Sequence, residues 1–346
     1  MVVRAALIND TSRVGHHGCT VVMRRIAALA AAAGIEVRGR YPADMPPEHL
    51  PWGDIDLVMV NGEGSLHGDR RVAFDVARWG AEARRRAMPS ALINTVYQNN
   101  GEAVADLIRA YDLVFCRESA SRAALTRAGI PAETVPDLSL TWRPRSAAGA
   151  GNHVVFGDST IRATTRRLYE VARAIDAPRF TLMTEPPRLP DQPWSNRKHI
   201  LRHRWLRLVA PLGLSSPHLG SGAKVFPDPE TLVRWLSAEA AVLVTGRFHA
   251  ACIALDLGLP VLAIRSNTHK IEALFADVGL EDRMIDLEDL PALARDGTLA
   301  TRTFTSDERT RIAAFLADGE RRATAMFGRI AALTGTAARH DMDASA

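Results

Sequence analysis

AAVLVTGRFHAACIALDLGLPVLAI, residues 240–264, joins two uninterrupted apolar runs through a segment of helical length. The first run ends at Gly246, a helix is expected over His249–Leu257, and the second run begins at Pro260. Strands without apolar–polar alternation are typical of parallel sheets that are covered by helices on both faces. The segment therefore predicts a strand–helix–strand unit of an α/β protein.

The same alternation extends outward from this segment in both directions. It precedes a small-residue linker, RPRSAAGAGN at 143–152, and restarts after it, with shorter strands expected at 179–185 and 223–228. We therefore predict an α/β fold with two Rossmann-like domains facing each other across a cleft, the GT-B-like arrangement, and a C-terminal helix that crosses back. The predicted parts are an N-terminal domain (1–145), a C-terminal domain (153–305), the crossing helix (306–333) and a flexible tail (334–346).

The composition is that of an ordinary globular protein and argues against several classes of function. Of the 346 residues, 47% are hydrophobic, and the formal net charge is +4. No apolar run approaches the ~20 residues that span a bilayer, and no signal peptide is present, so we expect a cytoplasmic protein. The modest basic excess carries no aromatic-interleaved motif, which argues against nucleic acid as a partner. Cys19, Cys116 and Cys252 are far apart and outside any CxxC, so we expect no metal site and no disulfide framework.

A glycine-rich motif, NGEGSLH, follows the apolar run at 57–60. Glycines at a strand-to-helix turn allow backbone N–H groups to face an anion. This placement makes Gly62, Gly64 and Ser65 candidate donor-binding residues. The alternative is an ordinary tight turn that His67 caps locally.

A second motif of the first half, FCRES, puts Arg117 where a strand enters a helix. A guanidinium at that position is suited to a carboxylate or phosphate, which it binds through two hydrogen bonds. The alternative is a salt bridge to Glu118 or to another acid, because arginine is the default cation of this chain. The sequence alone leaves both interpretations open.

The second half carries two comparable motifs at strand ends. In TGRFHAA, Arg247 and His249 follow the strand-ending Gly246, so His249 lies in the first turn of an apolar helix and is a candidate general acid or base. In SNTHK, Lys270 begins the next helix, where a cation opposes the helix dipole unless an anion is bound nearby. The alternatives are a structural histidine and a solvated lysine.

Together these motifs resemble one known family. GEGSLH, CRES, VPDLSL, GRFHAACIALDLGLPVLAI and HK…GL, in this order, resemble the polysaccharide pyruvyl transferases over about 9–280. The resemblance implies a GT-B-like fold and transfer of a pyruvyl group from phosphoenolpyruvate, as co-substrate, onto sugar hydroxyls without a resident cofactor. It also implies that Arg117 is the conserved arginine, His249 the catalytic histidine and Lys270 the donor-binding lysine. Arg247, in the same motif as His249, is expected to bind the donor as well.

Two loops depart from the usual pattern of that family. The first is GHHGC at 15–19, and the second carries Glu63 in place of the middle residue of a triple glycine. We expect both loops at the cleft, where His16, His17, Glu63 and His67 contact the acceptor or the donor. A carboxylate close to phosphoenolpyruvate would repel it unless it points to the acceptor, so these loops leave open a different acceptor or a different donor.

The leading interpretation is a transferase that pyruvylates a sugar of a surface polysaccharide or of its lipid-linked precursor. One alternative is a GT-B-type glycosyltransferase that uses a nucleotide-activated sugar, and another is a non-catalytic sugar- or phosphate-binding protein. A basic amphipathic helix is expected at 197–209, which suits peripheral contact with an anionic membrane surface on the cytoplasmic side. The alternative is a helix whose apolar face packs on the second domain and whose arginines are solvated.

Overall fold

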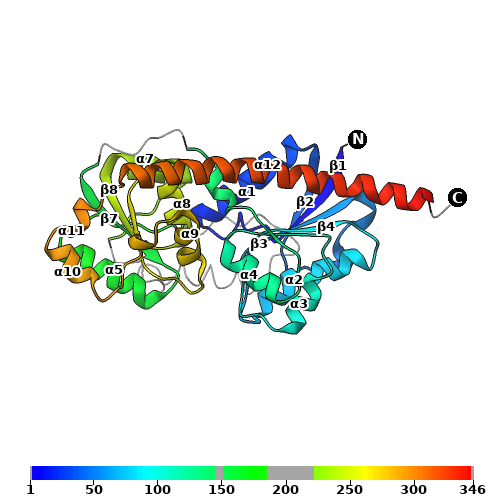
Figure 1. The fold of residues 1–346 in the computed structure, drawn as a ribbon, viewed down its shortest axis with the longest axis horizontal. Coiled ribbons are helices and arrows are strands. Elements are labelled where there is room, and N and C mark those ends of the chain that lie inside the picture. The colour runs from blue at the N-terminus through cyan, green and yellow to red at the C-terminus, as the bar shows by residue number, and fades with distance from the viewer. Residues whose placement is uncertain (1, 145–150, 185–221, 344–346) are drawn as a thin grey trace. The chain divides into compact units, whose positions relative to one another are not determined.

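The computed structural model describes residues 2–144, 151–184 and 222–343 (Figure 1). The chain divides into two compact units, unit 1 and unit 2. The units do not coincide with the two halves of the sequence. Ser12–Val21, in the first half, belongs to unit 2, and Ala317–Ala346, at the C-terminus, belongs to unit 1. Unit 1 comprises Met1–Thr11, Val22–Thr141 and Ala317–Ala346, and unit 2 comprises Ser12–Val21 and Trp142–Leu316.

Unit 1 is built on a six-stranded parallel sheet with the strand order β2-β1-β3-β4-β5-β6. The central strands are buried along almost their whole length, which explains their uninterrupted apolar sequences. The strands are β1 (Val3–Ile8), β2 (Ile35–Tyr41), β3 (Leu57–His67), β4 (Ser90–Gln98), β5 (Leu113–Cys116) and β6 (Glu133–Thr134).

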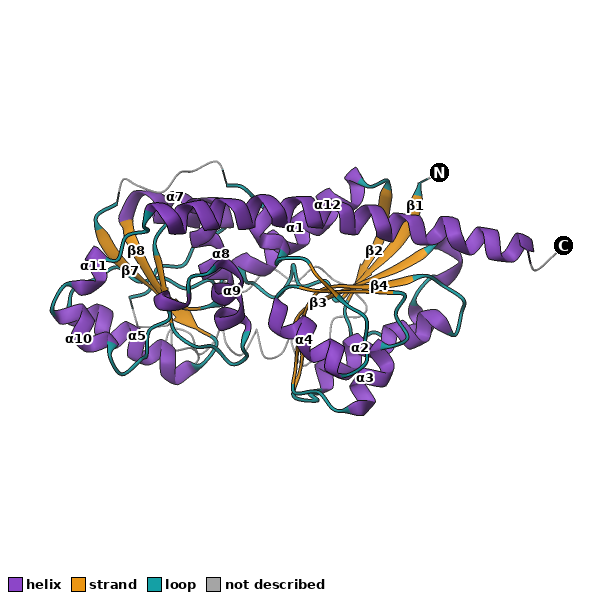
Figure 2. Ribbon diagram, viewed as in Figure 1, coloured by secondary structure: helices purple, strands orange, loops and turns teal. Residues whose placement is uncertain are grey.

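Helices cover both faces of this sheet (Figure 2). Successive side chains of a strand point to opposite faces, so Val58 and Val60 belong to one core while Leu57 and Met59 belong to the other. The first core is closed by α2 (Arg71–Arg84), α3 (Glu102–Ile108) and α4 (Ser119–Arg127). The second is closed by α1 (His17–Ala32) and by the C-terminal part of α12 (Ser306–Asp343).

Unit 2 contains a three-stranded parallel sheet with the order β7-β8-β9. The expected strands at 179–185 and 223–228 are present as isolated bridges, Phe156 with Arg179 and Phe180 with Lys224, rather than as ladders. The strands are β7 (His153–Ser159), β8 (Ala240–Gly246) and β9 (Val261–Ala263), and the helices are α5 (Arg162–Ala174), α7 (Pro229–Glu239), α8 (Phe248–Leu257), α9 (Lys270–Val278), α10 (Leu290–Arg295) and α11 (Thr298–Thr301).

These observations confirm the predicted fold class: the protein is α/β, with two Rossmann-like units and a long C-terminal helix. The end of that helix was predicted wrongly at 333, because α12 continues to Asp343. The residues beyond 333 include alanines and an arginine, which favour helix, and no proline stops them. That the two units face each other across a cleft stays a prediction.

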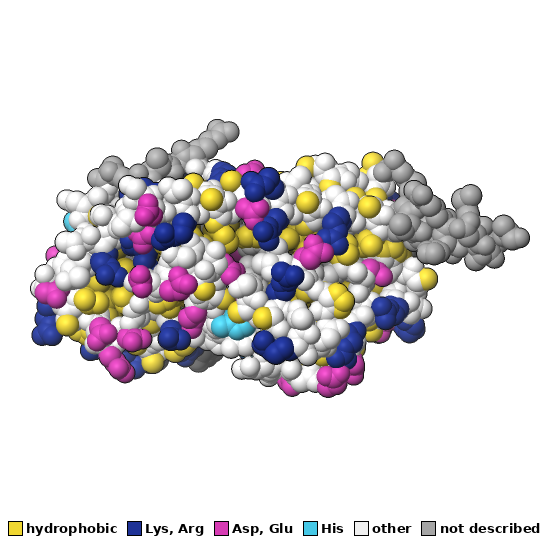
Figure 3. Space-filling model, viewed as in Figure 1, with side chains coloured by type: hydrophobic (Ala, Val, Ile, Leu, Met, Phe, Trp, Pro, Cys, Tyr) yellow, Lys and Arg dark blue, Asp and Glu magenta, His cyan; other side chains and the backbone are white. Residues whose placement is uncertain are grey.

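On the face drawn in Figure 3, Lys and Arg side chains are interspersed with Asp and Glu rather than gathered in one patch. Among the helices of 2–144, 151–184 and 222–343, none is both long and apolar enough to cross a bilayer. The basic amphipathic helix predicted for 197–209 lies outside the described residues.

Candidate active site

His249 lies at the predicted strand end, in the first turn of α8 directly after β8. Gly246 ends β8 opposite Ser159 of β7, and a Cβ on Gly246 would lie 2.7 Å from the Ser159 Cβ. Glycine therefore allows the two strand ends to approach closely, and the chain turns into α8 at the carboxyl edge of the sheet. This is the edge at which ligands bind in parallel sheets.

Arg247 forms the turn between β8 and α8 and is fixed by a buried carboxylate. Its Nη2 donates to Oδ2 of Asp158 at 2.8 Å, and Thr181 Oγ1 donates to the same oxygen at 2.9 Å. Asp158 lies at the end of β7 and is fully buried. The ion pair therefore orients the guanidinium at the sheet edge and offsets part of its charge.

His16 lies immediately before α1 and packs against His249. The two ring centroids are 5.4 Å apart in an edge-to-face arrangement. A Cβ on Gly18 would come within 2.2 Å of the His249 ring, so only glycine permits this approach of α1 to α8. His17 is also buried, so the GHHGC loop contributes side chains to the surroundings of His249 within unit 2.

Lys270 is the first residue of α9 and is buried, so it is not the solvated lysine that the sequence left as an alternative. Its Nζ donates to Oδ1 of Asn267 at 2.8 Å. Thr160 lies beside the same group, with its Oγ1 3.1 Å from the Ser266 Oγ and 3.3 Å from the Asn267 Oδ1. An ammonium, an amide and two hydroxyls thus converge beyond the ends of β7 and β9, and Thr160 is a member that sequence reasoning missed.

The pKa of His16 reflects its burial and the basic surroundings at this edge of the sheet. Burial holds the pKa of its imidazole well below the usual value, and the nearby Arg247, His249, His17 and Lys270 lower it further. Each of these groups disfavours another positive charge on the ring. Five sequence-predicted residues are therefore brought together in unit 2, in surroundings that attract an anion.

The NGEGSLH motif of unit 1 was predicted wrongly to form a strand-to-helix turn. It lies inside β3, which continues to His67 and keeps its pairing with β4 through an irregularity between Glu63 and Leu66. Glu63 itself has a positive φ of 40°. A Cβ on Gly62 would lie 2.3 Å from the Thr95 side chain, so this glycine serves close strand approach. Glycine pairs signal such bulges as well as turns, which explains the error.

The polar side chains of that motif have local partners. Thr11 Oγ1 donates to Oε1 of Glu63 at 2.7 Å. His67 places Nδ1 2.9 Å from the Gly64 carbonyl and Nε2 3.0 Å from the Arg70 guanidinium. The local role for His67, which the sequence left as an alternative, is thus observed, and Ser65 lies beside these groups in β3.

Arg117 lies between β5 and α4, as predicted, but it is buried and paired with carboxylates. Its Nη1 is 3.1 Å from Oδ2 of Asp137, and its Nε is 3.8 Å from Oε2 of Glu118. Both acids are 1% exposed. Gly64 lies beside the guanidinium, because a Cβ there would be 3.9 Å from Nη2 and near no other side chain. The structure therefore joins Gly64 and Arg117 at the edge of unit 1.

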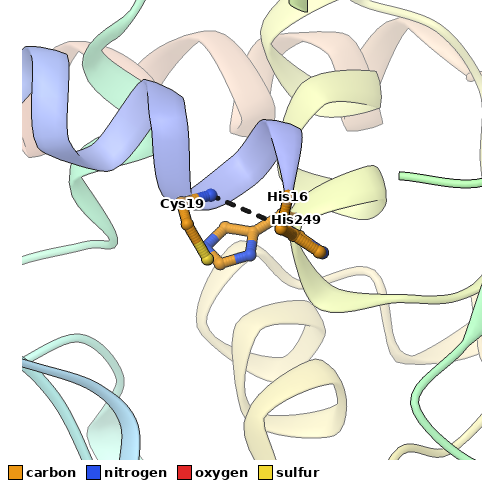
Figure 4. A group of neighbouring side chains, drawn as sticks. All are labelled: His16, Cys19 and His249. Carbon is orange, nitrogen blue, oxygen red and sulfur yellow. Dashed lines mark hydrogen bonds between the residues drawn. The ribbon is translucent and has the colours of Figure 1, made fainter. Parts of the chain in front are cut away.

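Cys19 is the residue that sequence reasoning treated as inert and that the structure places at the site. Potential ligand atoms of His16, Cys19 and His249 all lie within 4.8 Å of one another (Figure 4). The cysteine spacing gave no sign of this group of potential ligands, and the expectation that the chain has no metal site stays a prediction. His16 and Cys19 are three residues apart, which was a usable signal, but His249 is brought to them by the fold alone.

Comparisons with known proteins agree with this architecture. The family described as polysaccharide pyruvyl transferase matches residues 24–268. No curated protein matches the chain. Similar solved structures include a putative UDP-N-acetylglucosamine 2-epimerase from Listeria monocytogenes, with 12% identity, a TM-score of 0.52 and coverage of 94% of each chain. The structure titled "OtsA apo structure" has 9% identity and a TM-score of 0.52, over 94% of this chain and 97% of the other. At such identities the likeness concerns the fold, which is GT-B-like.

Proposed function

The chain belongs to the polysaccharide pyruvyl transferase family, and on that premise we propose that it transfers a pyruvyl group from phosphoenolpyruvate to a sugar of a surface polysaccharide or of its lipid-linked precursor. The single observation that carries the choice of donor is the set of basic side chains around His16. Phosphoenolpyruvate bears a carboxylate and a phosphate, and such an anion requires more than one fixed cation.

The phosphate of the donor is assigned to the Lys270 group. Lys270 offers a point charge, while Thr160 and Ser266 offer hydroxyl donors, and the Asn267 side chain already orients the ammonium. Arg247 extends the positive edge and is held in place by Asp158. A lysine at the start of α9 is tolerated against the helix dipole when an anion lies beside it.

His249 is assigned to proton transfer. It protonates the methylene carbon of phosphoenolpyruvate while a sugar hydroxyl adds to the neighbouring carbon. The phosphate then leaves, and a second hydroxyl closes the ketal. Of the two hydroxyl protons that the sugar gives up, one replaces the proton delivered to the methyl group and the other leaves with phosphate. Positioned proton transfer of this kind contributes typically 10²–10⁴-fold to a rate, as an order-of-magnitude guide.

Unit 1 is assigned mainly to the acceptor. The Glu63 carboxylate, paired with Thr11, is an acceptor group for sugar hydroxyls and would repel a polyanionic donor. Gly62, Gly64 and Ser65 belong to the same end of β3, and the His67 ring contacts the Gly64 carbonyl there. Arg117 keeps a donor-binding role in this proposal through its Nη2, which lies beside Gly64.

The location of the enzyme follows from the acceptor class. A lipid-linked precursor presents its sugar at a membrane surface, so we propose a cytoplasmic enzyme with peripheral contact to anionic lipid through 197–209. Co-sedimentation with anionic and neutral liposomes at low and moderate salt tests this. Binding should require anionic lipid and weaken as salt shortens the screening length to ~8 Å. Equal recovery in the supernatant in every condition would contradict the contact.

Donor identity is tested by thermal shift with phosphoenolpyruvate and with a panel of nucleotide sugars. A ligand present at ~100 times its dissociation constant stabilises the protein by roughly 2.7 kcal/mol. We expect phosphoenolpyruvate to raise the melting temperature and nucleotide sugars to leave it unchanged. The reverse result would favour a glycosyltransferase. Stabilisation by phosphoenolpyruvate without phosphate release, when a panel of glycans is supplied, would favour a non-catalytic binding protein.

A further inference from the structure

One cluster in unit 2 joins the proposed catalytic histidine to a thiol that the transfer reaction does not require. His16, Cys19 and His249 bring together two imidazoles and a thiol, with ligand atoms that all lie within 4.8 Å of one another (Figure 4). A tetrahedral zinc site with two nitrogens and one sulfur has its ligand atoms about 3.5 Å apart, given bond lengths of about 2.0–2.3 Å. Small side-chain rotations therefore close the observed arrangement around an ion.

The local structure prepares these side chains. Cys19 lies in the first turn of α1, so the start of the helix fixes the position of its side chain. His16 immediately precedes that helix, and its Nδ1 accepts a long 3.4 Å hydrogen bond from the Cys19 backbone N–H, so little is lost when the imidazole turns. Gly18, between them, lets the His249 ring approach α1. Backbone elements thus fix all three positions.

We propose that His16, Cys19 and His249 form a site for a divalent transition-metal ion of the Zn²⁺ class, with water or an anion as the fourth ligand. Nitrogen and sulfur ligands in this combination suit zinc and disfavour the hard cations magnesium and calcium. Three protein ligands leave one coordination position open. On binding, the Cys19 thiol releases its proton to solvent and the thiolate sulfur bonds to the ion.

The charges around the cluster determine which fourth ligand a bound metal ion would take. Lys270 and Arg247 lie nearby and oppose a bare dication, although the buried Asp158 offsets Arg247. The Cys19 thiolate supplies one negative charge, and an anion in the open position supplies more. Inorganic phosphate is therefore expected to strengthen metal binding rather than compete with it.

The site has a consequence for catalysis that rests on the proposed function. An imidazole nitrogen that is bonded to a metal ion cannot deliver a proton, so metal-bound His249 is removed from the transfer reaction. Zn²⁺ is therefore expected to inhibit the enzyme, and a chelator to restore it. The metal site itself does not depend on which reaction the enzyme performs.

The test is a titration of the full-length, chelator-treated protein with Co²⁺, followed by displacement with Zn²⁺. Co²⁺ is a spectroscopic substitute for zinc, and thiolate ligation gives it an intense near-ultraviolet charge-transfer band. We expect one ion per chain, with that band and visible bands of tetrahedral intensity. Cys19→Ser should abolish the thiolate band, and His16→Gln should weaken binding roughly tenfold or more.

Matched controls separate this site from incidental binding. Cys116→Ser alters a buried thiol of unit 1, and His153→Ala removes a half-exposed histidine of unit 2, so both should bind Co²⁺ as the wild type does. Melting curves recorded without metal establish that each variant is folded. A thiolate band that survives in folded Cys19→Ser, or the absence of any Co²⁺ band in the wild type, would overturn the metal site. Metal binding without inhibition would overturn only the assigned role of His249.

Discussion

Unit 1 and unit 2 each place a cation at the carboxyl edge of a parallel sheet, but they balance its charge differently. Arg117 of unit 1 is buried between two carboxylates, Asp137 and Glu118. Lys270 of unit 2 donates to the neutral amide of Asn267 and lies near further basic side chains. The same topology therefore gives one edge whose arginine is enclosed by two carboxylates, and another edge with a lysine beside an arginine that Asp158 offsets. This difference is why we assign the anionic donor to unit 2 and the sugar mainly to unit 1.

The largest expected effect concerns the chemistry assigned to unit 2. His249→Ala should lower turnover by roughly 10²–10⁴-fold, because it removes the positioned proton donor, while affinity for phosphoenolpyruvate changes little. Steady-state kinetics together with calorimetric titration of phosphoenolpyruvate measure the two quantities. His153→Ala, outside the cluster, should behave as the wild type. Near-normal turnover of the His249 variant would remove the catalytic assignment.

The charge balance of unit 1 predicts a loss of stability rather than a purely functional defect. Arg117→Ala leaves Asp137 and Glu118 buried without their cation, and breaking a buried pair in this way costs about 3–5 kcal/mol. Urea denaturation followed by circular dichroism measures this. Donor affinity should fall as well, through the position beside Gly64. A variant as stable as the wild type would show that the ion pairs are not what holds this edge.

Lys270→Ala in unit 2 should lower donor affinity more than it lowers stability, in contrast to Arg117→Ala in unit 1. The Lys270 ammonium donates to the neutral amide of Asn267, so the cost in stability should be smaller than for Arg117→Ala. Affinity for phosphoenolpyruvate should fall about 10- to 100-fold, since a charge-assisted hydrogen bond contributes about 1.5–3 kcal/mol. Calorimetric titration tests this, with Lys224→Ala as a lysine control. Unchanged affinity would place the donor elsewhere.

Some features of the molecule could be predicted from its sequence, and others could not. The strands of unit 1 were predictable because burial on both faces demands uninterrupted apolar runs. The positions of His249 and Lys270 at the carboxyl edge of the sheet were predictable because each residue follows a strand. Glu118 was named from the sequence as an alternative partner of Arg117, but Asp137 and the Asp158 partner of Arg247 were not, because the fold brings them there. Cys19 was missed for the same reason: its site needs an imidazole from α8.

The NGEGSLH motif illustrates a different kind of error. Glycine is enriched in turns, so a turn was expected, yet Gly62 is required here because Thr95 of the neighbouring strand leaves no room for a side chain. The two uses of glycine look alike in one sequence. The positive φ of Glu63 in the same strand has no signal in residue type at all.

The smallest effect comes from an ion pair away from both edges, and it serves as a reference for electrostatic cost. Arg283 donates two hydrogen bonds to Glu308 at the start of α12, and these lower the pKa of Glu308 from 4.5 to about 2. A depressed carboxyl pKa stabilises the fold above pH 4.5, and that stabilisation disappears as the pH falls toward 2.

Glu308→Gln should therefore destabilise the protein at pH 7 by on the order of 2 kcal/mol, a cost that shrinks below pH 4.5. Thermal unfolding of both proteins between pH 7 and pH 3 measures the difference. Glu320→Gln, on the same helix, is a suitable control. A difference that stays constant over this range would mean that the pair does not act through the charge of Glu308.

Product analysis of the complete reaction tests the central claim most directly. The enzyme is incubated with phosphoenolpyruvate and a panel of polysaccharide-derived and lipid-linked glycans, while glycan mass and released phosphate are both measured. We predict a glycan that gains one pyruvyl ketal for each phosphate released, and no such product from the His249→Ala variant. A glycan that instead gains a hexose when a nucleotide sugar is supplied, with phosphoenolpyruvate left unconsumed, would contradict the account.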